Sequence, residues 1–502
     1  MGREYMKRYL VAVVGLALAI TPGFAQSKSF QLGSWIEIQN AILKELDRSY
    51  VDTLPLKKMQ RAAIDAMLAE LDPYTVYVPA EEVEDFSNQL GKSYGGIGAI
   101  ITKEEGKNVI LNEPYANSPC VLAGLESGDE ILTIDGQDVK PWATKECSDR
   151  MKGQPGSSVE FLVKKVHSGD TLKVKVRRER IHIPDVTYAG MIEPKTGYIQ
   201  VTGFTEGVGE IIRGKVKELK SQGMEKLFLD LRGNGGGLLS EAVEIVSIFL
   251  PKGSLVVTAK GRDEQNVQTY LSSKEPLDVN LKLAVLVDGG SASSSEIVSG
   301  ALQDMDRATI IGTRTFGKGL VQNIRPLPYG GQLKITVSKY YTPSGRCVQA
   351  IDYSKRNADG SVGHIPDSLT HEFKTAGGRT VRDGGGITPD IVIPAREYDE
   401  MLYYLILGGS VDAYALHYKQ THSQIGPAED FVFNEMEDFK SFVLGLLKEE
   451  SKAEFEAMDL EQFRPFIEEE IITRYYFQEE GVRRRLRYDE QLKAALKSNL
   501  VL

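Results

Sequence analysis

The sequence has little of what nucleic-acid-binding and metal-dependent proteins usually carry. Its 60 Lys and Arg residues are outnumbered by 70 Asp and Glu residues, the formal net charge is −10, and no long basic run occurs. Because a phosphate-binding surface needs clustered Lys and Arg, we expect no nucleic-acid partner. The three cysteines form no CxxC pair and no Cys/His cluster, so we also expect no metal site and no cofactor.

Histidine is equally scarce. The six are His167, His182, His364, His371, His417 and His422. None stands in a recognisable motif, and His371-Glu372 is not followed by the second His of an HExxH zinc site. A Ser–His–Asp protease and a zinc protease are therefore not expected. Cys120, Cys147 and Cys347 are interpreted as structural, and their odd number leaves at least one thiol unpaired in an oxidising compartment.

An apolar run stands near the N-terminus and has the features of an export signal. Arg3, Lys7 and Arg8 precede the apolar stretch 9–20, and small residues follow up to Ala25. The run is shorter than the roughly 20 residues that span a bilayer, so we interpret residues 1–25 as a cleaved signal peptide rather than a membrane anchor. The mature protein is then exported, and in a Gram-negative bacterium it is periplasmic.

The length of 502 residues exceeds what one hydrophobic core supports. Apolar residues spaced by about 3.6 positions favour an N-terminal helical segment over 34–90. Short strands, a Gly-rich loop and two short helices favour a PDZ-like domain over 92–180. Alternating strands and helices predict an α/β core over 182–395, and 396–502 is charged and largely helical. The expected fold class is thus multidomain, α+β together with α/β.

The first stretch that suggests chemistry is Asp230-Leu231-Arg232 followed by Gly233-Asn234-Gly235-Gly236-Gly237. A continuous apolar strand runs directly into this Gly-rich turn, where the backbone can approach a ligand closely. No Lys-Ser/Thr follows, so it is not a phosphate-binding P-loop. It is interpreted as an oxyanion hole, and the alternative is a tight strand-to-helix turn without chemistry.

The second stretch is Gly289-Gly290-Ser291-Ala292-Ser293-Ser294-Ser295-Glu296, after another buried strand. Small residues suit a nucleophile on a sharp turn, and the helix that starts there offers free N–H groups. The alternative is that these serines only cap the helix, with Glu296 completing a capping box.

The third stretch is Thr315-Phe316-Gly317-Lys318-Gly319-Leu320-Val321-Gln322. A lysine between two glycines and among apolar residues can approach another backbone, and burial lowers its pKa. A neutral amine can accept the proton of a serine hydroxyl. Gln322 lies four residues on, a spacing that on a helical turn brings it near that amine.

These three stretches, in this order, resemble the signatures of the carboxyl-terminal processing (tail-specific) proteases over roughly residues 35–395. In that family the nucleophile lies 25 residues before the lysine, which selects Ser293 here. The resemblance implies a crotonase-like α/β protease core, with Lys318 as general base and Gln322 as its orienting partner. It also implies oxyanion donors at Ser294 and in the glycine turn, where we favour Gly236. Ser294 replaces the family's usual Ala but keeps the N–H donor.

Further motifs agree with this resemblance. Leu71-Asp72-Pro73-Tyr74-Thr75 resembles the family's N-terminal helical segment, and the stretches 340–346 and 386–390 resemble its late core motifs. Gly95-Gly96-Ile97-Gly98 resembles the carboxylate-binding loop of a PDZ domain, whose amides hold a peptide terminus. The resemblance implies protein or peptide substrates with apolar C-terminal tails.

The function expected from the sequence is therefore a serine endopeptidase that recognises C-terminal tails and cleaves with a Ser–Lys(–Gln) site. The alternative is a non-catalytic PDZ scaffold with an inactive protease core. The region 396–502 matches no family function, and we consider a role for it in forming a homo-oligomer or binding an adaptor protein.

Overall fold

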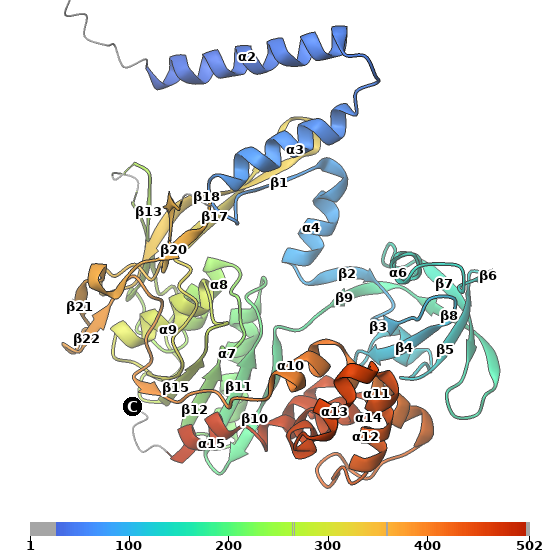
Figure 1. Cartoon of the computed structure of the whole chain (residues 1–502). Coiled ribbons are helices and arrows are strands. Elements are labelled where there is room, and N and C mark those ends of the chain that lie inside the picture. The colour runs from blue at the N-terminus through green and yellow to red at the C-terminus, as the bar shows by residue number, and fades with distance from the viewer. Residues whose placement is uncertain (1–26, 264, 266, 358–359, 498–502) are drawn as a thin grey trace, which may run out of the picture. The chain divides into compact units, whose positions relative to one another are not determined.

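The computed structural model describes residues 27–263, 265, 267–357 and 360–497, so the expected signal peptide lies outside the described residues. The chain forms two compact units, one ending at Glu70 and one starting at Leu71. Figure 1 shows the whole chain and labels elements of both units. No helix in the described ranges is both long enough and apolar enough to cross a bilayer.

The first unit consists of the helices α2, Lys28–Ser49, and α3, Leu56–Ala69. Ser27 caps α2, because its side chain accepts the N–H of Phe30 at 3.2 Å. Neither helix contains a buried residue. The helices expected in this region are confirmed.

The PDZ domain forms a sheet in the order β3-β4-β5-β7-β8, with β6 paired to β5. The strands are β3 Ala99–Thr102, β4 Val109–Pro114, β5 Glu130–Ile134, β6 Gln137–Asp138, β7 Ser158–Lys164 and β8 Thr171–Arg177. Two helices, α5 Pro119–Leu122 and α6 Thr144–Met151, complete it. Strand β2, Ser93–Gly96, pairs with β9, Glu179–His182, so the chain enters and leaves the domain side by side. The expected PDZ-like domain is confirmed.

The protease core contains a six-stranded sheet in the order β10-β11-β12-β15-β16-β23, parallel except for the β10–β11 pair. The strands are β10 Val186–Glu193, β11 Thr196–Val201, β12 Lys226–Asp230, β15 Lys282–Val287, β16 Thr309–Gly312 and β23 Ile391–Val392. Three helices alternate with them, α7 Val208–Ser221, α8 Leu239–Val246 and α9 Ser294–Asp304. The expected α/β core is confirmed.

Both faces of this sheet are buried, since neighbouring residues along each strand point to opposite sides. On β12, Leu227 and Leu229 belong to the cluster formed with α7, α8 and α9. Phe228 belongs to the cluster on the other face, where Leu492 and Ala495 of α15, Glu490–Lys497, complete the packing. Figure 1 shows α15 beside β12 and β15.

A second sheet contacts α8 and α9 through its strand β13 and contains segments from distant parts of the chain. Its order is β1-β18-β13-β14, with β17 also paired to β18. The strands are β1 Val76–Val78, β13 Leu255–Gly261, β14 Val267–Leu271, β17 Leu320–Pro326 and β18 Gln332–Tyr341. Strand β1 pairs antiparallel with β18, joining the segment after Asp72 to the sheet that carries β17.

The C-terminal region is helical, as expected. Its helices are α10 Glu400–Leu407, α11 Ser410–Thr421, α12 Met436–Leu446, α13 Glu449–Glu456 and α14 Arg464–Leu486. Their core is rich in aromatic residues; Tyr414, Phe439 and Phe463, for example, are completely buried. These aromatic residues give the C-terminal helices a hydrophobic core of their own.

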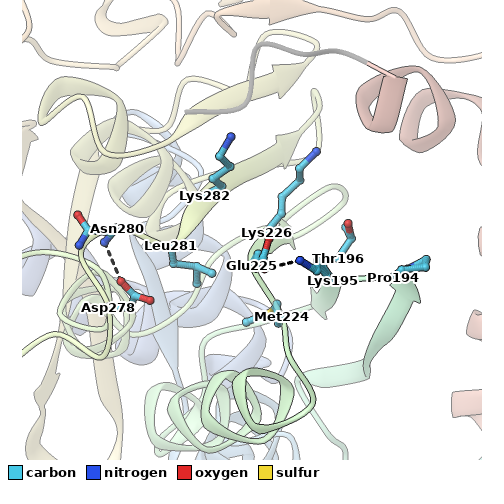
Figure 2. Close-up of a pocket in the computed structure, with 10 residues that line it drawn as sticks. All are labelled: Pro194, Lys195, Thr196, Met224, Glu225, Lys226, Asp278, Asn280, Leu281 and Lys282. Atoms are coloured by element: carbon cyan, nitrogen blue, oxygen red, sulfur yellow. Dashed lines mark hydrogen bonds and ion pairs between the residues drawn. The ribbon is translucent and has the colours of Figure 1, made fainter.

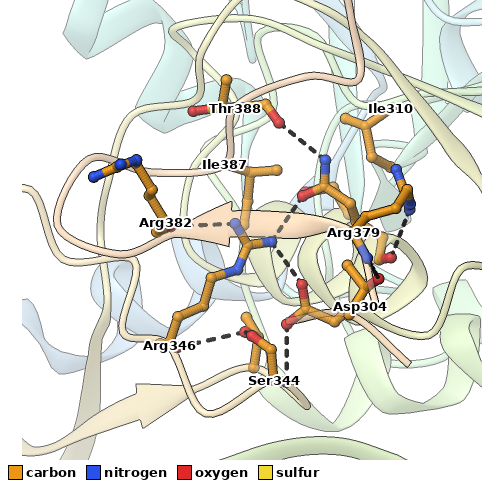
Figure 3. Close-up of polar contacts among 12 residues, drawn as sticks. Asp304, Ile310, Ser344, Arg346, Arg379, Arg382, Ile387 and Thr388 are labelled. Atoms are coloured by element: carbon orange, nitrogen blue, oxygen red, sulfur yellow. Dashed lines mark hydrogen bonds and ion pairs between the residues drawn. The ribbon is translucent and has the colours of Figure 1, made fainter. Parts of the chain in front are cut away.

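A buried ion pair fixes the C-terminal end of α9, shown in Figure 3. Arg346, only 1% exposed, donates to Asp304 at 2.8 Å and to Gln303 at 2.7 Å. The backbone N–H of Ser344 donates to the same Asp304 carboxylate at 3.0 Å. The stretch 340–346 therefore helps to hold α9, the helix that begins at Ser294.

Candidate active site

The glycine turn and the serine stretch meet at the C-terminal ends of β12 and β15, the edge where open α/β sheets bind ligands. The Asp288 carboxylate accepts N–H groups from both: Gly233 at 2.8 Å, Gly290 at 2.9 Å and Ser291 at 3.1 Å. One half-buried carboxylate thus holds the two loops together.

Asn234 makes a second connection between these loops. It is fully buried, and its side chain donates to the carbonyl oxygen of Val201 at 2.8 Å. Its own carbonyl oxygen accepts the N–H of Ala292 at 3.0 Å. These connections cannot be predicted from the sequence, because Gly233, the partner of Asp288 on the other loop, and Val201, the partner of Asn234, lie far away in the chain.

Three of the four serines in this stretch are committed to buried hydrogen bonds. The hydroxyls of Ser291, Ser294 and Ser295 donate to the carbonyl oxygens of Leu231 at 2.8 Å, Gly237 at 3.0 Å and Asn234 at 2.8 Å. Ser293 is the half-exposed member. Within the described part of the chain its hydroxyl donates no hydrogen bond, and its side chain forms the capping box of α9 together with Glu296, as the capping interpretation of the sequence expects.

The backbone at Ser293 is strained, with φ 56° and ψ −112°. A non-glycine residue rarely adopts a positive φ, and such positions cluster at active sites. Ser293 immediately precedes α9, whose first N–H groups have no partner within the helix and lie at its positive end. The N–H of Ser294, the first residue of α9, is one of these groups.

Glu296 links the serine loop to the lysine loop. Its buried carboxylate accepts the N–H groups of Ser293 at 2.9 Å, Gly317 at 2.7 Å and Lys318 at 2.8 Å. It also accepts the hydroxyl of Thr315 at 2.7 Å. Burial raises the pKa of Glu296, and these four donors oppose that shift. The sequence suggested only the capping contact with Ser293, so the connection to the lysine loop is new.

Tyr340 provides another connection between the same loops. Its buried hydroxyl lies within hydrogen-bond distance of two carbonyl oxygens, 3.1 Å from that of Ser293 and 2.7 Å from that of Lys318. The backbones of the two proposed catalytic residues are therefore fixed relative to each other from two sides, by Glu296 and by Tyr340.

The glycines on either side of Lys318 are required by close packing. A Cβ at Gly317, where φ is +88°, would lie 2.3 Å from the Cβ of Ala350, and one at Gly319 would lie 2.8 Å from the N of Gln349. The lysine is half-buried as a result. Burial and the neighbouring charge of Lys334 lower the pKa of Lys318 to about 8. Such a lysine is partly neutral near physiological pH, as a general base requires.

The Lys318 ammonium lies over the ring of Tyr74, 4.1 Å from the ring centroid. No hydrogen bond joins it to Ser293 or Gln322 among the described residues. Gln322 lies on strand β17, so our expectation of a helical turn between Lys318 and Gln322 is wrong. Its side-chain amide donates to the hydroxyl of Thr336 on β18 at 3.2 Å. The cause is strand pairing with β18, which the local sequence does not reveal.

Gly236 lies against the serine loop. A Cβ there, at φ +98°, would fall 2.8 Å from the Cβ of Ser293 and 2.9 Å from the N of Ser294. Its N–H donates to the side-chain oxygen of Asn234 at 2.9 Å. The turn therefore approaches Ser293 closely, while the Gly236 N–H has an internal partner.

Asp230 and Arg232, at the start of the same loop, form a structural network. Arg232 pairs with Asp230 and, from the C-terminal region, with Asp489, each at 2.5 Å. Tyr198 donates its buried hydroxyl to Asp230 at 2.5 Å, and burial raises the pKa of that hydroxyl. This network fixes the root of the glycine turn.

The four residues of the proposed peptide-binding loop lie where β2 ends and β3 begins. Gly95 and Gly96 belong to β2, and a Cβ at Gly95 would lie 2.1 Å from the carbonyl oxygen of Gly153. Ile97 is buried and accepts the N–H of Cys120, and Gly98 has a φ of +79°. Close backbone packing thus accounts for Gly95, whereas a Cβ at Gly96 would meet the ring of Tyr94 at 2.7 Å.

The three cysteines take no part in this site. All three thiols are free, Cys120 and Cys147 are buried, and Cys347 is half-buried. Burial raises the pKa of all three thiols, which makes them poor nucleophiles.

A pocket elsewhere in the core is shown in Figure 2. It is lined by residues at the starts of β11, β12 and β15, among them Thr196, Lys226 and Lys282. It therefore lies at the edge of the sheet opposite Ser293, and its lysine Lys195 already pairs with Glu225 at 2.7 Å. It is not part of the candidate active site.

Comparison with known proteins identifies the families of three parts of the chain. Residues 195–354 match Peptidase family S41, residues 88–164 match the PDZ domain, and residues 443–498 match the C-terminal helical domain of a probable PDZ-protease. The assignment of the tail, which sequence analysis left without a family, comes from the last of these.

Individual relatives carry related names. A carboxy-terminal-processing protease of Bartonella bacilliformis is 34% identical over 344 residues, covering 68% of this chain and 77% of that protein. A probable CtpA-like serine protease of Staphylococcus aureus is 35% identical over 315 residues, 62% of each chain. Among solved structures, a photosystem II D1 C-terminal processing protease is 27% identical over 72% of this chain and 87% of that one, with a TM-score of 0.39.

Proposed function

Because the chain belongs to the carboxy-terminal-processing proteases of peptidase family S41, we propose that it is a serine endopeptidase with Ser293 as nucleophile and Lys318 as general base. The observation that carries the proposal is the contrast among the clustered serines. Three hydroxyls are committed to backbone carbonyls, whereas Ser293 is half-exposed and strained at the start of α9. The lysine on the adjoining loop has a lowered pKa.

The proposed reaction begins when the neutral Lys318 amine accepts the proton of the Ser293 hydroxyl. The Ser293 oxygen then attacks the peptide carbonyl, and the tetrahedral oxyanion is stabilised by the N–H of Ser294 and by that of Gly236, which turns to it from its partner Asn234. The ammonium passes its proton to the leaving amine, and water releases the acyl group by the same steps in reverse. In this scheme the amide oxygen of Gln322 accepts from Lys318 and orients it.

Substrate capture is assigned to the PDZ domain. We propose that the amides of the 95–98 loop hold the terminal carboxylate of a substrate while its tail adds a strand to the domain. Apolar tails suit such a site because the surrounding domain core is apolar. Residues 1–25 are proposed to direct export, to the periplasm in a Gram-negative cell, before removal near Ala25.

The experiment that tests the proposal compares the mature wild type with Ser293→Ala and with a matched control, Ser299→Ala. Ser299 lies on the same helix and donates to the carbonyl oxygen of Ser295 at 2.8 Å, within the core. We expect Ser293→Ala to abolish cleavage of an unfolded protein and to keep its affinity for a peptide with an apolar C-terminus. Ser299→Ala should cleave at the wild-type rate. Cleavage by Ser293→Ala at the wild-type rate would refute the assignment.

The same experiment also tests the alternative that the protein is a non-catalytic PDZ scaffold. A wild type that binds the peptide but never cleaves, even after its pH is raised above 8, would have the properties of that scaffold. Labelling of Ser293 by a fluorophosphonate reagent, located by mass spectrometry, is the result that the protease predicts.

A further inference from the structure

The segment Asp72–Thr75 has no place in the reaction proposed above, yet it forms one wall around the catalytic lysine. The ring of Tyr74 faces the Lys318 ammonium at 4.1 Å from the ring centroid. Both side chains are half-buried. A cation over an aromatic face within about 6 Å is attracted by the ring quadrupole, and partial burial strengthens that attraction.

The turn that carries Tyr74 is tightly held. One oxygen of the buried Asp72 carboxylate accepts the N–H groups of Tyr74 and Thr75, each at 2.9 Å. The other oxygen accepts the Thr75 hydroxyl at 3.0 Å. The backbone of Tyr74 is therefore fixed on its own side by a single carboxylate.

The turn is also joined to the strand beside the lysine loop. The Thr75 hydroxyl oxygen accepts the N–H of Thr336 at 3.2 Å, and Val76 is the register partner of Lys334 on β18. Thr336 is the residue whose hydroxyl accepts the amide of Gln322. Three segments, the turn, β17 and β18, thus converge on the lysine.

The ring itself is held by a second tyrosine. Tyr353 meets it edge to face at a centroid distance of 6.0 Å, and its hydroxyl donates to that of Tyr74 at 3.4 Å. Tyr74 is therefore constrained both at its backbone and at its ring. A surface side chain without a positioning role would not need both constraints.

We propose that Tyr74 is a positioning residue of the catalytic centre, whose ring face holds the Lys318 ammonium between the serine loop and strand β17. The inference rests on the proposed function, because it gives Tyr74 a role only through Lys318. In the resting protein the ring retains the charged lysine, and loss of a proton frees the amine to turn toward Ser293.

The contact has a predictable electrostatic sign. The ring face stabilises the charged form of Lys318, so weakening it favours the neutral amine at lower pH. The other charged groups that act on this lysine are Lys334 on β18, Glu296 on α9 and Asp72 in the turn, and they stay the same when only the ring at 74 changes.

The test replaces Tyr74 in the full mature chain by phenylalanine and by phenylalanines bearing one, two and three ring fluorines. Fluorine weakens the quadrupole with little change in ring shape, so the variants should fold alike. Lys318 is titrated directly, by the pH dependence of its acylation with acetic anhydride followed by mass spectrometry. We expect the midpoint to fall stepwise, by about half to one pH unit from phenylalanine to the trifluorinated ring.

The matched control is Tyr353→Phe, which removes a hydroxyl beside Tyr74 and leaves the ring over Lys318. Its Lys318 midpoint should equal that of the wild type within the error of the titration. A constant midpoint across the fluorinated series would overturn the inference. If the proposed function itself is wrong, the wild type will show no fluorophosphonate labelling of Ser293. That result comes from a different measurement, so it is distinguished from a failure of the inference about Tyr74.

Discussion

At the scale of single residues, the partners of a side chain separate catalytic from structural roles better than its identity does. Ser291, Ser294 and Ser295 share the residue type of Ser293 and stand within two positions of it, yet each is tied to a carbonyl oxygen. The sequence alone left these serines equivalent, and only the family spacing selected Ser293. Hydrogen-bond partners depend on the folded loops, which residue order does not specify.

The lowered pKa of Lys318 predicts how the labelling of Ser293 depends on pH. Below about 8 the Lys318 amine is protonated and cannot accept a proton, so labelling of Ser293 should rise as the pH passes through that value. Lys334 is a like charge that lowers the pKa of Lys318. In Lys334→Met that pKa should rise, moving the labelling midpoint up by about 0.5–1 pH unit.

The measurement is the fluorophosphonate labelling rate from pH 6 to 10, a range of roughly two units on either side of the expected midpoint. Lys339→Met is the control, since it removes the same charge from an exposed position of β18. It should leave the midpoint in place. A downward shift in Lys334→Met would contradict the sign of this electrostatic argument.

At the scale of elements, α9 begins directly after Ser293 of the candidate active site, and it is fixed at both ends. Glu296 ties its first turn to the lysine loop, and Asp304 at its last turn pairs with Arg346. Breaking a buried ion pair by removing one partner leaves an uncompensated charge, which typically costs about 3–5 kcal/mol.

We therefore expect Arg346→Met to lower the free energy of unfolding by about 3–5 kcal/mol, measured by urea denaturation. Arg382→Met is the comparison, because its pair with Glu372 is more than half exposed on both sides. Its loss should be about 0–1 kcal/mol. Equal losses in the two variants would show that the Asp304–Arg346 pair does not anchor the helix.

Most elements could be predicted from the sequence because their apolar patterns are local. Strands such as β12 and β15 are continuous apolar runs, and α7 has helical periodicity. Strand β17 could not be predicted, since the polar residues Gln322, Asn323 and Arg325 leave it no continuous apolar face. The strand is defined by its pairing with β18. The Asp72–Thr75 turn was assigned to a helical segment for the same reason, as its partner Thr336 is remote.

At the scale of the whole molecule, the C-terminal tail completes the protease core. Leu492 and Ala495 of α15 cover the sheet face that carries Phe228 and Leu286, and Asp489 pairs with Arg232 beside the glycine turn. The tail has no catalytic motif, so sequence analysis gave it no task beyond assembly. Its contact with the sheet makes it part of the fold that supports the site.

Because α15 packs on the core sheet, truncating one of its buried residues should lower the free energy of unfolding. Leu492→Ala should lower the free energy of unfolding by about 2–5 kcal/mol, the usual cost of truncating a buried leucine. Leu446→Ala, at a position 56% exposed, should change it by no more than about 0.5 kcal/mol. Urea denaturation measures both, and an unchanged stability in Leu492→Ala would mean that α15 does not cover the sheet.

The most direct test of the central claim is cleavage of an unfolded protein with an apolar C-terminal tail, comparing the mature wild type with Lys318→Ala. The account predicts that the wild type cleaves, with a rate that rises through pH 8, and that Lys318→Ala does not cleave at any pH. Cleavage by Lys318→Ala at the wild-type rate would contradict it, because the reaction would then proceed without the proposed general base.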